Sequence, residues 1–187
     1  MFRPLAAFSL SLLAALPAFA QEVQKPKQLV IVSFDGAGDN TLWERSRTTA
    51  KEVGAHFTYF LACTLVMDRK TSAKTYQGPG QKAGRSNVGF GQSPDEVEAR
   101  LRNIWAAYRE GHEIANHTCG HFDGGQWTAE QWDGEFTTFT STLENAWQMI
   151  GKKGEEPEGW RDMVKKINGF RAPYLSQGPA LTAAQKK

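Results

Sequence analysis

The fold is decided by residues 27–61, which read KQLVIVSFDGAGDNTLWERSRTTAKEVGAHFTYFL. The run from Lys27 to Phe34 is continuous, apolar and rich in β-branched residues, which predicts a buried β-strand. A second apolar run, from Phe57 to Leu61, predicts another strand. A segment of helical length lies between the two runs, so we expect a strand–helix–strand unit with parallel strands.

The segment between the two strands carries the end signals of a helix. Asp39 or Asn40 can cap its first turn, because a short polar side chain there accepts hydrogen bonds from unpaired backbone N–H groups. The helix is expected from about Thr41 to Val53, and Gly54 can end it in the left-handed conformation that glycine adopts readily.

Strands and helices continue to alternate along the chain. A second helix opens at Ser93-Pro94-Asp95, with a capping residue, a first-turn proline and acidic residues at the positive end. Short strands are expected at Glu113–Asn116 and Ile167–Phe170. The long helix that starts at Thr128 has an apolar stripe, which indicates core packing: Trp132, Phe136, Phe139, Leu143, Trp147 and Ile150. This alternation predicts a parallel α/β fold, as an open sheet or as a barrel.

Residues 64–92 interrupt the alternation, with five glycines, several basic residues and few aliphatic ones. Long irregular segments are uncommon in compact domains and tend to be functional or mobile. We interpret this segment as an insertion near the mouth of a site or as a plain surface loop.

The composition is that of one globular domain. The chain has 187 residues, 40% hydrophobic and 22% charged, which excludes a disordered tail, a collagen-like repeat and a coiled coil. Its 22 basic and 20 acidic residues give a formal charge of +2, without the concentrated positive charge of a nucleic-acid or membrane-surface binder. Two cysteines are too few for a dense disulfide scaffold or a four-cysteine zinc site.

The first twenty residues have the features of a signal peptide. Arg3 supplies a positive start, an apolar run covers Leu5–Leu16, and Ala18–Ala20 gives the small-x-small pattern that signal peptidase recognises. The apolar run is shorter than the ~20 residues that cross a bilayer. We therefore expect a signal peptide at 1–20 and a folded domain at 21–187, secreted or periplasmic and without stable membrane insertion after cleavage.

Reactive residue types follow three of the predicted strands, in the segments Ser33–Gly36, His117–His121 and Arg171–Tyr174. In parallel α/β folds, chemistry gathers where loops leave the carboxyl ends of the strands. Two imidazoles four residues apart suit a single metal ion, although such a pair can also be two surface histidines. An Asp from another strand end would complete a site of two His and one carboxylate, open to water and substrate.

Together and in this order, the three segments resemble the motifs of the polysaccharide deacetylases, carbohydrate esterase family 4, whose domain is also called the NodB-homology domain. That family has a Thr/Ser-Phe-Asp-Asp-Gly strand end, a His-Ser/Thr-x-x-His loop and an Arg-x-Pro-Tyr/Phe strand end. The resemblance extends over roughly residues 28–178 and includes Gly111–Thr118, which reads GHEIANHT. It implies a (β/α) barrel similar to the distorted seven-stranded barrel of the family.

The resemblance also implies roles for individual residues. His117 and His121 match the two histidines that bind a divalent metal, in the first place zinc. Asp35 matches the general base that takes a proton from metal-bound water, and Arg171 matches the arginine that orients this aspartate. Tyr174 lies where the family uses a backbone N–H to bind the developing oxyanion. The implied reaction is hydrolysis of N- or O-acetyl groups on a polysaccharide or oligosaccharide, so the implied partner is an acetylated glycan.

One position departs from the family pattern. Gly36 stands where the family has its second Asp, the usual carboxylate ligand of the metal. Asp39 can reach the metal from the next turn, or Asp35 is the ligand and another group acts as base. Alternatively, His117 and His121 bind metal weakly and the chain is not a catalyst.

The end of the sequence departs as well. No Leu-x-His motif, whose histidine acts as general acid in the family, follows the Arg-x-Pro-Tyr segment, so the domain is expected to be C-terminally incomplete or diverged. The two other histidines, His56 and His112, are expected to be packed structural residues.

Two further functions are compatible with the sequence. One is a catalytically inactive, deacetylase-like glycan-binding protein that uses Trp105, Trp127 or Trp132 as stacking platforms. The other is a relative that hydrolyses non-peptide C–N bonds in small amides. An intact set of one Asp and two His at the metal favours an enzyme, whereas its absence favours the binding protein.

Cys63 and Cys119 both follow predicted strands that would be neighbours in the sheet. In an oxidising compartment they can form a disulfide, which typically stabilises a fold by ~2–4 kcal/mol. Two unpaired, partly buried thiols are the simpler interpretation.

Overall fold

The structure, a computed structural model, describes residues 27–186. The signal peptide expected at 1–20 lies outside the described residues and stays a prediction. The chain divides into a unit at 1–30 and a unit at 31–187, and the helices and strands below all belong to the second. No helix between residues 27 and 186 combines the length and the apolar character that crossing a membrane requires.

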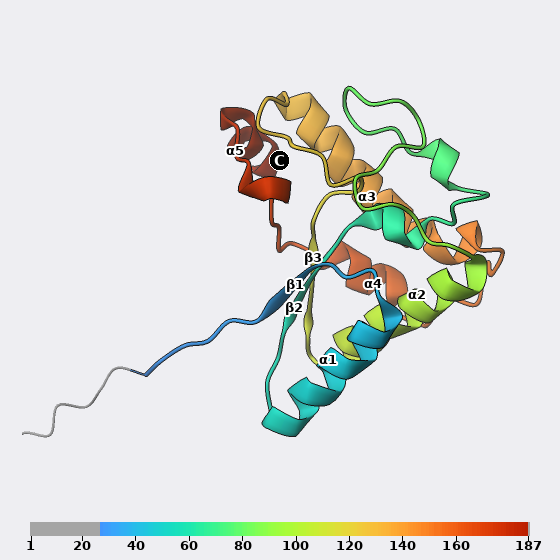
Figure 1. The fold of residues 1–187 in the computed structure, drawn as a ribbon, viewed down its shortest axis with the longest axis vertical. Helices are drawn as coiled ribbons and strands as arrows, with labels where there is room; N and C mark the ends of the chain where they lie inside the picture. The colour runs from blue at the N-terminus through green and yellow to red at the C-terminus, as the bar shows by residue number, and fades with distance from the viewer. Residues whose placement is uncertain (1–26, 187) are drawn as a thin grey trace, which may run out of the picture. The chain divides into compact units, whose positions relative to one another are not determined.

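The sheet has three short parallel strands in the order β1-β2-β3 (Figure 1). They are β1 (Ser33–Gly36), β2 (Thr58–Leu61) and β3 (Glu113–Asn116). The register pairs Gly36 with Leu61 and Leu61 with Asn116, so the carboxyl ends of these strands meet at one edge. The predicted strand at 167–170 is reduced to a bridge between Asn116 and Phe170. The parallel α/β fold is confirmed, whereas the strands within 27–186 do not close into a barrel.

The first strand is shorter and more exposed than predicted. Residues 27–32 are not in a strand, and Ile31 and Val32 expose 77% and 38% of their surface. β1 lies at the edge of the sheet, with β2 on one side only. The prediction of a buried strand at Lys27–Phe34 is therefore wrong for most of its length, because an apolar run is buried only where a neighbouring element covers it.

The first two helices begin and end where the sequence signals placed them. Helix α1 (Asn40–Val53) is capped by Asp39 and ends at Gly54, which adopts the left-handed conformation with φ +62°. Helix α2 (Pro94–Arg109) is capped by the hydroxyl of Ser93. In Figure 1, α1 and α2 lie side by side, in agreement with the contacts between them.

Helix α3 (Ala129–Met149) is the longest of the described helices. Thr128 and Gln131 form a capping box at its start, in which each side chain bonds the other's backbone N–H. The predicted stripe is buried, with Phe136 only half-buried. The remaining helices are too short to have been predicted from periodicity: α4 (Trp160–Lys165), α5 (Pro179–Gln185), and the 3₁₀ turns η1 (Cys63–Val66), η2 (Ala73–Thr75) and η3 (Pro173–Leu175).

The core joins side chains from the sheet and from four helices. Its largest members include Trp43 of α1, Tyr59 of β2, Leu101 of α2, Trp147 of α3 and Trp160 of α4, each at most 2% exposed. Large aromatic side chains remove much apolar surface from water and dominate the packing of such cores.

Cys63 and Cys119 are joined by a disulfide and are both fully buried. The interpretation of two unpaired thiols is therefore wrong. The sequence could not decide this, because pairing depends on how closely the segments after β2 and β3 approach one another. Parallel pairing of these strands brings the two cysteines to the same end of the sheet.

Replacing both cysteines with alanine is expected to destabilise the protein by about 2–4 kcal/mol, because the disulfide restricts the unfolded chain between Cys63 and Cys119. Urea unfolding of the wild type and of the Cys63→Ala/Cys119→Ala variant would measure this difference. Two titratable thiols in the denatured wild type, purified after export, would contradict the pairing itself.

The two remaining histidines behave differently from one another. His112 is buried, and its Nδ1 accepts a hydrogen bond of 3.0 Å from the backbone N–H of Phe57. His112 is thus a packed structural histidine, as expected. His56 is exposed, although its ring lies in a T-shaped contact with that of His112, so the same expectation is wrong for His56.

Burial lowers the pKa of His112 below its usual value of about 6.5. The imidazole of His112 therefore binds a proton more readily in the unfolded chain than in the folded protein. Its contribution to the free energy of unfolding is fully present above about pH 6.5 and is lost as the pH falls below that value. The matched variant is His112→Asn, whose amide oxygen can still accept from Phe57 and does not titrate. Between about pH 7.5 and about pH 5.5, the urea midpoint of the wild type should decrease more than that of this variant. Equal decreases in the two proteins would contradict the prediction.

Candidate active site

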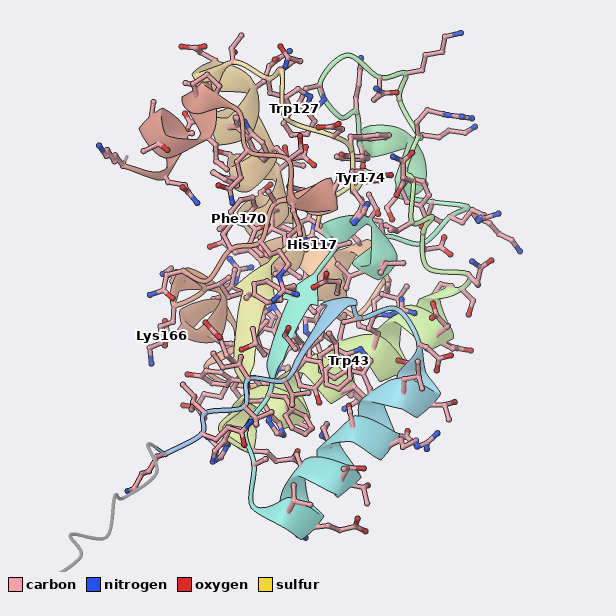
Figure 2. The ribbon with its side chains drawn as sticks, turned by 60° about the vertical axis from the view of Figure 1, so that its left-hand side comes forward. Trp43, His117, Trp127, Lys166, Phe170 and Tyr174 are labelled. Carbon is pink, nitrogen blue, oxygen red and sulfur yellow. A yellow bond between two sulfur atoms is a disulfide. The ribbon has the colours of Figure 1, made fainter. Side chains whose placement is uncertain are left out.

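The three sequence motifs meet at the carboxyl edge of the sheet. Asp35 lies in β1, His117 directly follows β3, and the backbone N–H of Arg171 donates to the carbonyl of Asn116 at 3.0 Å. Figure 2 shows His117 at this end of the strands, with Tyr174 close to it. The structure therefore brings together residues that are far apart in the sequence.

Arg171 holds the carboxylate of Asp35. Its Nη1 donates to Oδ1 of Asp35 at 2.6 Å, and its Nη2 donates to the hydroxyl of Ser33 at 2.9 Å. The guanidinium carbon also lies 4.2 Å from the ring centre of Phe60, within the range of a cation–π contact. These contacts orient Asp35 so that its second oxygen, Oδ2, lies 3.9 Å from Nε2 of His117.

His117 is buried and has one nitrogen available. Its Nδ1 lies 2.7 Å from the backbone carbonyl of Arg171, and since a carbonyl can only accept, Nδ1 is the nitrogen that carries hydrogen. The other nitrogen, Nε2, is buried without a hydrogen-bond partner. Burial lowers the pKa of His117, which favours the neutral ring. A neutral imidazole whose Nδ1–H is bound to a carbonyl, with Nε2 free, is the form in which histidine binds a metal.

His121 completes the pair. Its ring centre lies 4.8 Å from that of His117 and 4.9 Å from that of Tyr174. Its backbone has a φ of +53°, and its carbonyl accepts from the side-chain amide of Asn87 at 3.0 Å. The second imidazole, that of His121, and the carboxylate of Asp35 thus each lie close to His117.

The residues fit a metal incompletely. Nε2 of His117, buried, unpartnered and next to a second imidazole, is a suitable ligand. Within residues 27–186, however, no three His, Cys, Asp or Glu side chains are arranged closely enough to hold an ion together. The carboxylate that the structure places next to His117 is that of Asp35.

The structure does not bring Asp39 to the histidines. Its Oδ1 accepts from the backbone N–H groups of Thr41 at 2.8 Å and Leu42 at 3.1 Å, which is the bonding pattern of a helix cap. This carboxylate serves the first turn of α1. Gly36 has a φ of +78°, a conformation that residues with side chains rarely adopt.

Tyr174 lies at the mouth of the site. It is 60% exposed, has a φ of +57°, and its hydroxyl lies 3.3 Å from the side-chain amide nitrogen of Asn87. The role of its backbone N–H at an oxyanion stays a prediction.

No family model matches the chain, and no curated protein matches it either. Several solved structures do match. A family 4 acetyl xylan esterase from Clostridium thermocellum, in complex with a cobalt ion, is 18% identical with a TM-score of 0.49, over 84% of this chain and 54% of that chain. A chitin deacetylase from the fungal pathogen Colletotrichum lindemuthianum is 15% identical with a TM-score of 0.49, over 83% and 50%. A CE4 family pseudoenzyme from Bacillus anthracis is 15% identical with a TM-score of 0.48, over 86% and 40%.

The chain is structurally similar to polysaccharide deacetylases over most of its length. It spans about half the length of these solved structures, or less.

Sequence reasoning missed several residues that build the site. Asn87 contacts both His121 and Tyr174, and Phe60 lies under the guanidinium of Arg171. Asn87 belongs to the irregular segment 64–92, where no periodic pattern marks individual residues. The one indication in the sequence is the irregular composition of that segment, which we interpret as an insertion near the mouth of a site or as a plain surface loop.

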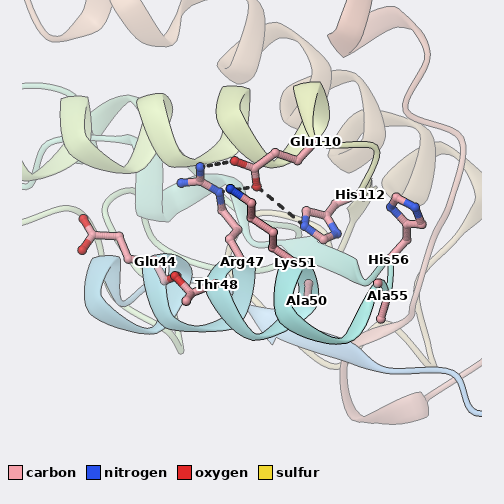
Figure 3. A pocket seen from close by; sticks show the side chains of 10 residues that line it. Glu44, Arg47, Thr48, Ala50, Lys51, Ala55, His56, Glu110 and His112 are labelled. Carbon is pink, nitrogen blue, oxygen red and sulfur yellow. Dashed lines mark hydrogen bonds and ion pairs between the residues drawn. The ribbon is translucent and has the colours of Figure 1, made fainter.

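A cavity of about 640 Å³ lies elsewhere, beside α1 and the segments that precede β2 and β3 (Figure 3). Its lining includes Arg47 and Glu110, which form a two-point ion pair, and His112, which lies 3.8 Å from Glu110. Arg47 and Glu110 already neutralise one another, and none of the three motifs contributes to the cavity. It is therefore not the candidate site.

Proposed function

We propose that this chain is a divalent-metal-dependent hydrolase that removes N- or O-acetyl groups from a polysaccharide or oligosaccharide. One observation carries the proposal: the buried, unpartnered Nε2 of His117 lies beside His121 and faces a carboxylate that Arg171 holds. The resemblance of the three motifs to those of polysaccharide deacetylases supports the same reaction.

His117 and His121 would hold the metal, and zinc suits nitrogen ligands of this kind. When bound, a divalent metal would polarise the acyl oxygen and lower the pKa of water toward about 7. We assign the third protein ligand to Asp35, because its Oδ2 faces Nε2 of His117 and Gly36 offers no carboxylate. In the alternative, Asp35 acts only as general base. Metal titration of the Asp35→Asn variant distinguishes this role from that of a ligand.

The side chains around the metal ligands have distinct tasks in this proposal. Arg171 binds Oδ1 of Asp35, which fixes the orientation of the carboxylate. The backbone carbonyl of Arg171 also holds Nδ1–H of His117 and thereby sets its tautomer. Tyr174, which is exposed and lies beside His121, would contact the glycan.

The proposal extends to fold and location. The three described strands would form part of a (β/α) barrel. The domain at 21–187 would be exported by the signal peptide at 1–20 to the periplasm or the outside of the cell, where acetylated glycans are found. The apolar run of Leu5–Leu16 supports export.

A second candidate function is glycan binding without turnover. Gly36 in place of a carboxylate, and the lack of three converging ligands within residues 27–186, favour it. Trp132 cannot act as a stacking platform, because it is fully buried. Trp105 and Trp127 are half-buried and Tyr174 is exposed, so these three side chains remain candidates for contact with a sugar ring.

The test combines metal analysis with an acetate-release assay. After dialysis against zinc, the protein is expected to retain about one ion per chain and to release acetate from N-acetylated or O-acetylated oligosaccharides. A protein that takes up no zinc, cobalt or nickel at neutral pH would refute the proposal. Binding of these oligosaccharides without acetate release would favour the second candidate.

A further inference from the structure

The loop His117–His121 has an unusual backbone. Thr118 and His121 have φ values of +62° and +53°, in the left-handed region that residues with side chains rarely occupy. Such conformations persist only where the surrounding structure imposes them. The contacts that impose them therefore decide where the ring of His121 lies.

The first half of the loop is tied to neighbouring strand ends. The N–H of Thr118 donates to the side chain of Asn116 at 2.7 Å, and its carbonyl accepts from the N–H of Cys63 at 3.0 Å. The disulfide between Cys119 and Cys63 adds a covalent tie. These contacts fix the loop up to Cys119.

The second half is tied to two buried side chains from other parts of the chain. Oε1 of Glu135, on α3, accepts from the N–H of Cys119 at 2.9 Å and from the hydroxyl of Tyr76 at 2.8 Å. The hydroxyl of Tyr76 in turn accepts from the N–H of Gly120 at 2.8 Å. Tyr76 comes from the irregular segment 64–92. Together, Tyr76 and Glu135 hold the two peptide N–H groups that precede His121.

The loop packs tightly against the hydroxyl of Tyr76. A Cβ at Gly120 would lie 2.6 Å from Oη of Tyr76 and 2.4 Å from the ring of Phe122. Only glycine fits there without a shift of its neighbours.

Glu135 is a carboxylate in an unusual environment. It is 2% exposed, and within residues 27–186 no Lys, Arg or His forms an ion pair with it. Burial raises the pKa of Glu135, and burial beside Glu135 raises that of Tyr76. A buried acid without a cation is costly for a fold. Its bonds go to the loop and to Tyr76, which indicates that its task is to hold the loop.

We propose that Glu135 and Tyr76 are positioning residues for His121. They hold the peptide groups of Cys119 and Gly120 so that the chain reaches His121 with its ring beside that of His117. This inference rests on the proposed metal site, because His121 acts there as a ligand.

Tyr76→Phe and Glu135→Gln test the proposal, because each removes a polar contact and keeps the shape of the side chain. Zinc affinity, measured by calorimetric titration, is expected to fall about 10-fold or more in both, as is typical when groups that orient metal ligands are lost. Tyr59→Phe is the matched control. Tyr59 is equally buried and its hydroxyl lies 2.8 Å from that of Ser46, away from the loop. This control should bind zinc as the wild type does.

A second measurement on the metal-free protein separates this inference from the proposed function. In Tyr76→Phe, the amides of Cys119 and Gly120 should exchange hydrogen faster, and the imidazole NMR signals of His121 should shift. If the wild type binds no zinc, the proposed function fails and these signals alone decide the positioning role. The positioning role would be overturned if both variants bound zinc as tightly as the wild type does. It would also be overturned if the His121 signals and the amide exchange of Tyr76→Phe were unchanged. If Glu135→Gln does not fold, Tyr76→Phe carries the test.

Discussion

Replacing His117 with alanine is expected to lower the affinity for zinc by about 100-fold or more and to abolish acetate release. The reason is that Nε2 of His117 is the buried, unpartnered nitrogen of the site and is the atom that we assign to the metal. The change exceeds that expected from a group that only orients a ligand, for which 10–100-fold is typical. Zinc titration and an acetate assay on the same preparations would measure both effects.

His56→Ala provides the matched control for this prediction. His56 is exposed and lies outside the three motifs, so its removal should leave zinc affinity and acetate release unchanged. Tight zinc binding by the His117→Ala variant would show that the metal lies elsewhere and would refute the assignment.

Replacing Asp35 with asparagine is expected to reduce turnover by about 10²–10⁴-fold, the usual contribution of a general base. The loss is expected in either role of Asp35, because the amide neither takes a proton nor offers a metal a charged oxygen. Zinc affinity separates the roles. We expect it to fall as well, because Oδ2 of Asp35 faces Nε2 of His117 and a neutral amide is a poorer ligand for a dication.

Asp39→Asn is the control carboxylate for Asp35→Asn. Asparagine caps a helix about as well as aspartate, so this variant should keep its stability, its zinc affinity and its turnover. A loss of zinc affinity in Asp39→Asn would instead show that Asp39 has taken the place of the missing ligand. Unchanged zinc affinity in Asp35→Asn would return Asp35 to the role of base alone, and unchanged turnover would remove it from the mechanism.

Local signals in the sequence were sufficient for the three long helices α1, α2 and α3. The cap at Asp39, the glycine at position 54, the Ser93-Pro94 start and the stripe after Thr128 all correspond to observed features. Capping and helical periodicity depend on residues within one or two turns, so a sequence contains the information needed to recognise them.

Features that depend on distant neighbours were not predictable in this way. The apolar run before β1 reads as a buried strand, yet Ile31 and Val32 are exposed, and among the described strands β1 has a neighbour on one side only. The pairing of Cys63 with Cys119 likewise depends on the approach of two loops.

The sequence by itself determined the alternation of strands and helices, and it identified the three segments that carry Asp35, His117 and Arg171. Only the tertiary structure decided what these residues do to one another. Arg171 lies 136 residues from the carboxylate that it binds and 54 residues from the histidine whose proton it fixes. The same holds for Tyr76 and Glu135, which are unremarkable in the sequence and hold the histidine loop in the fold. The physical reason is that a hydrogen bond requires two groups within about 3 Å, and between distant residues only the packing of the whole domain sets that separation.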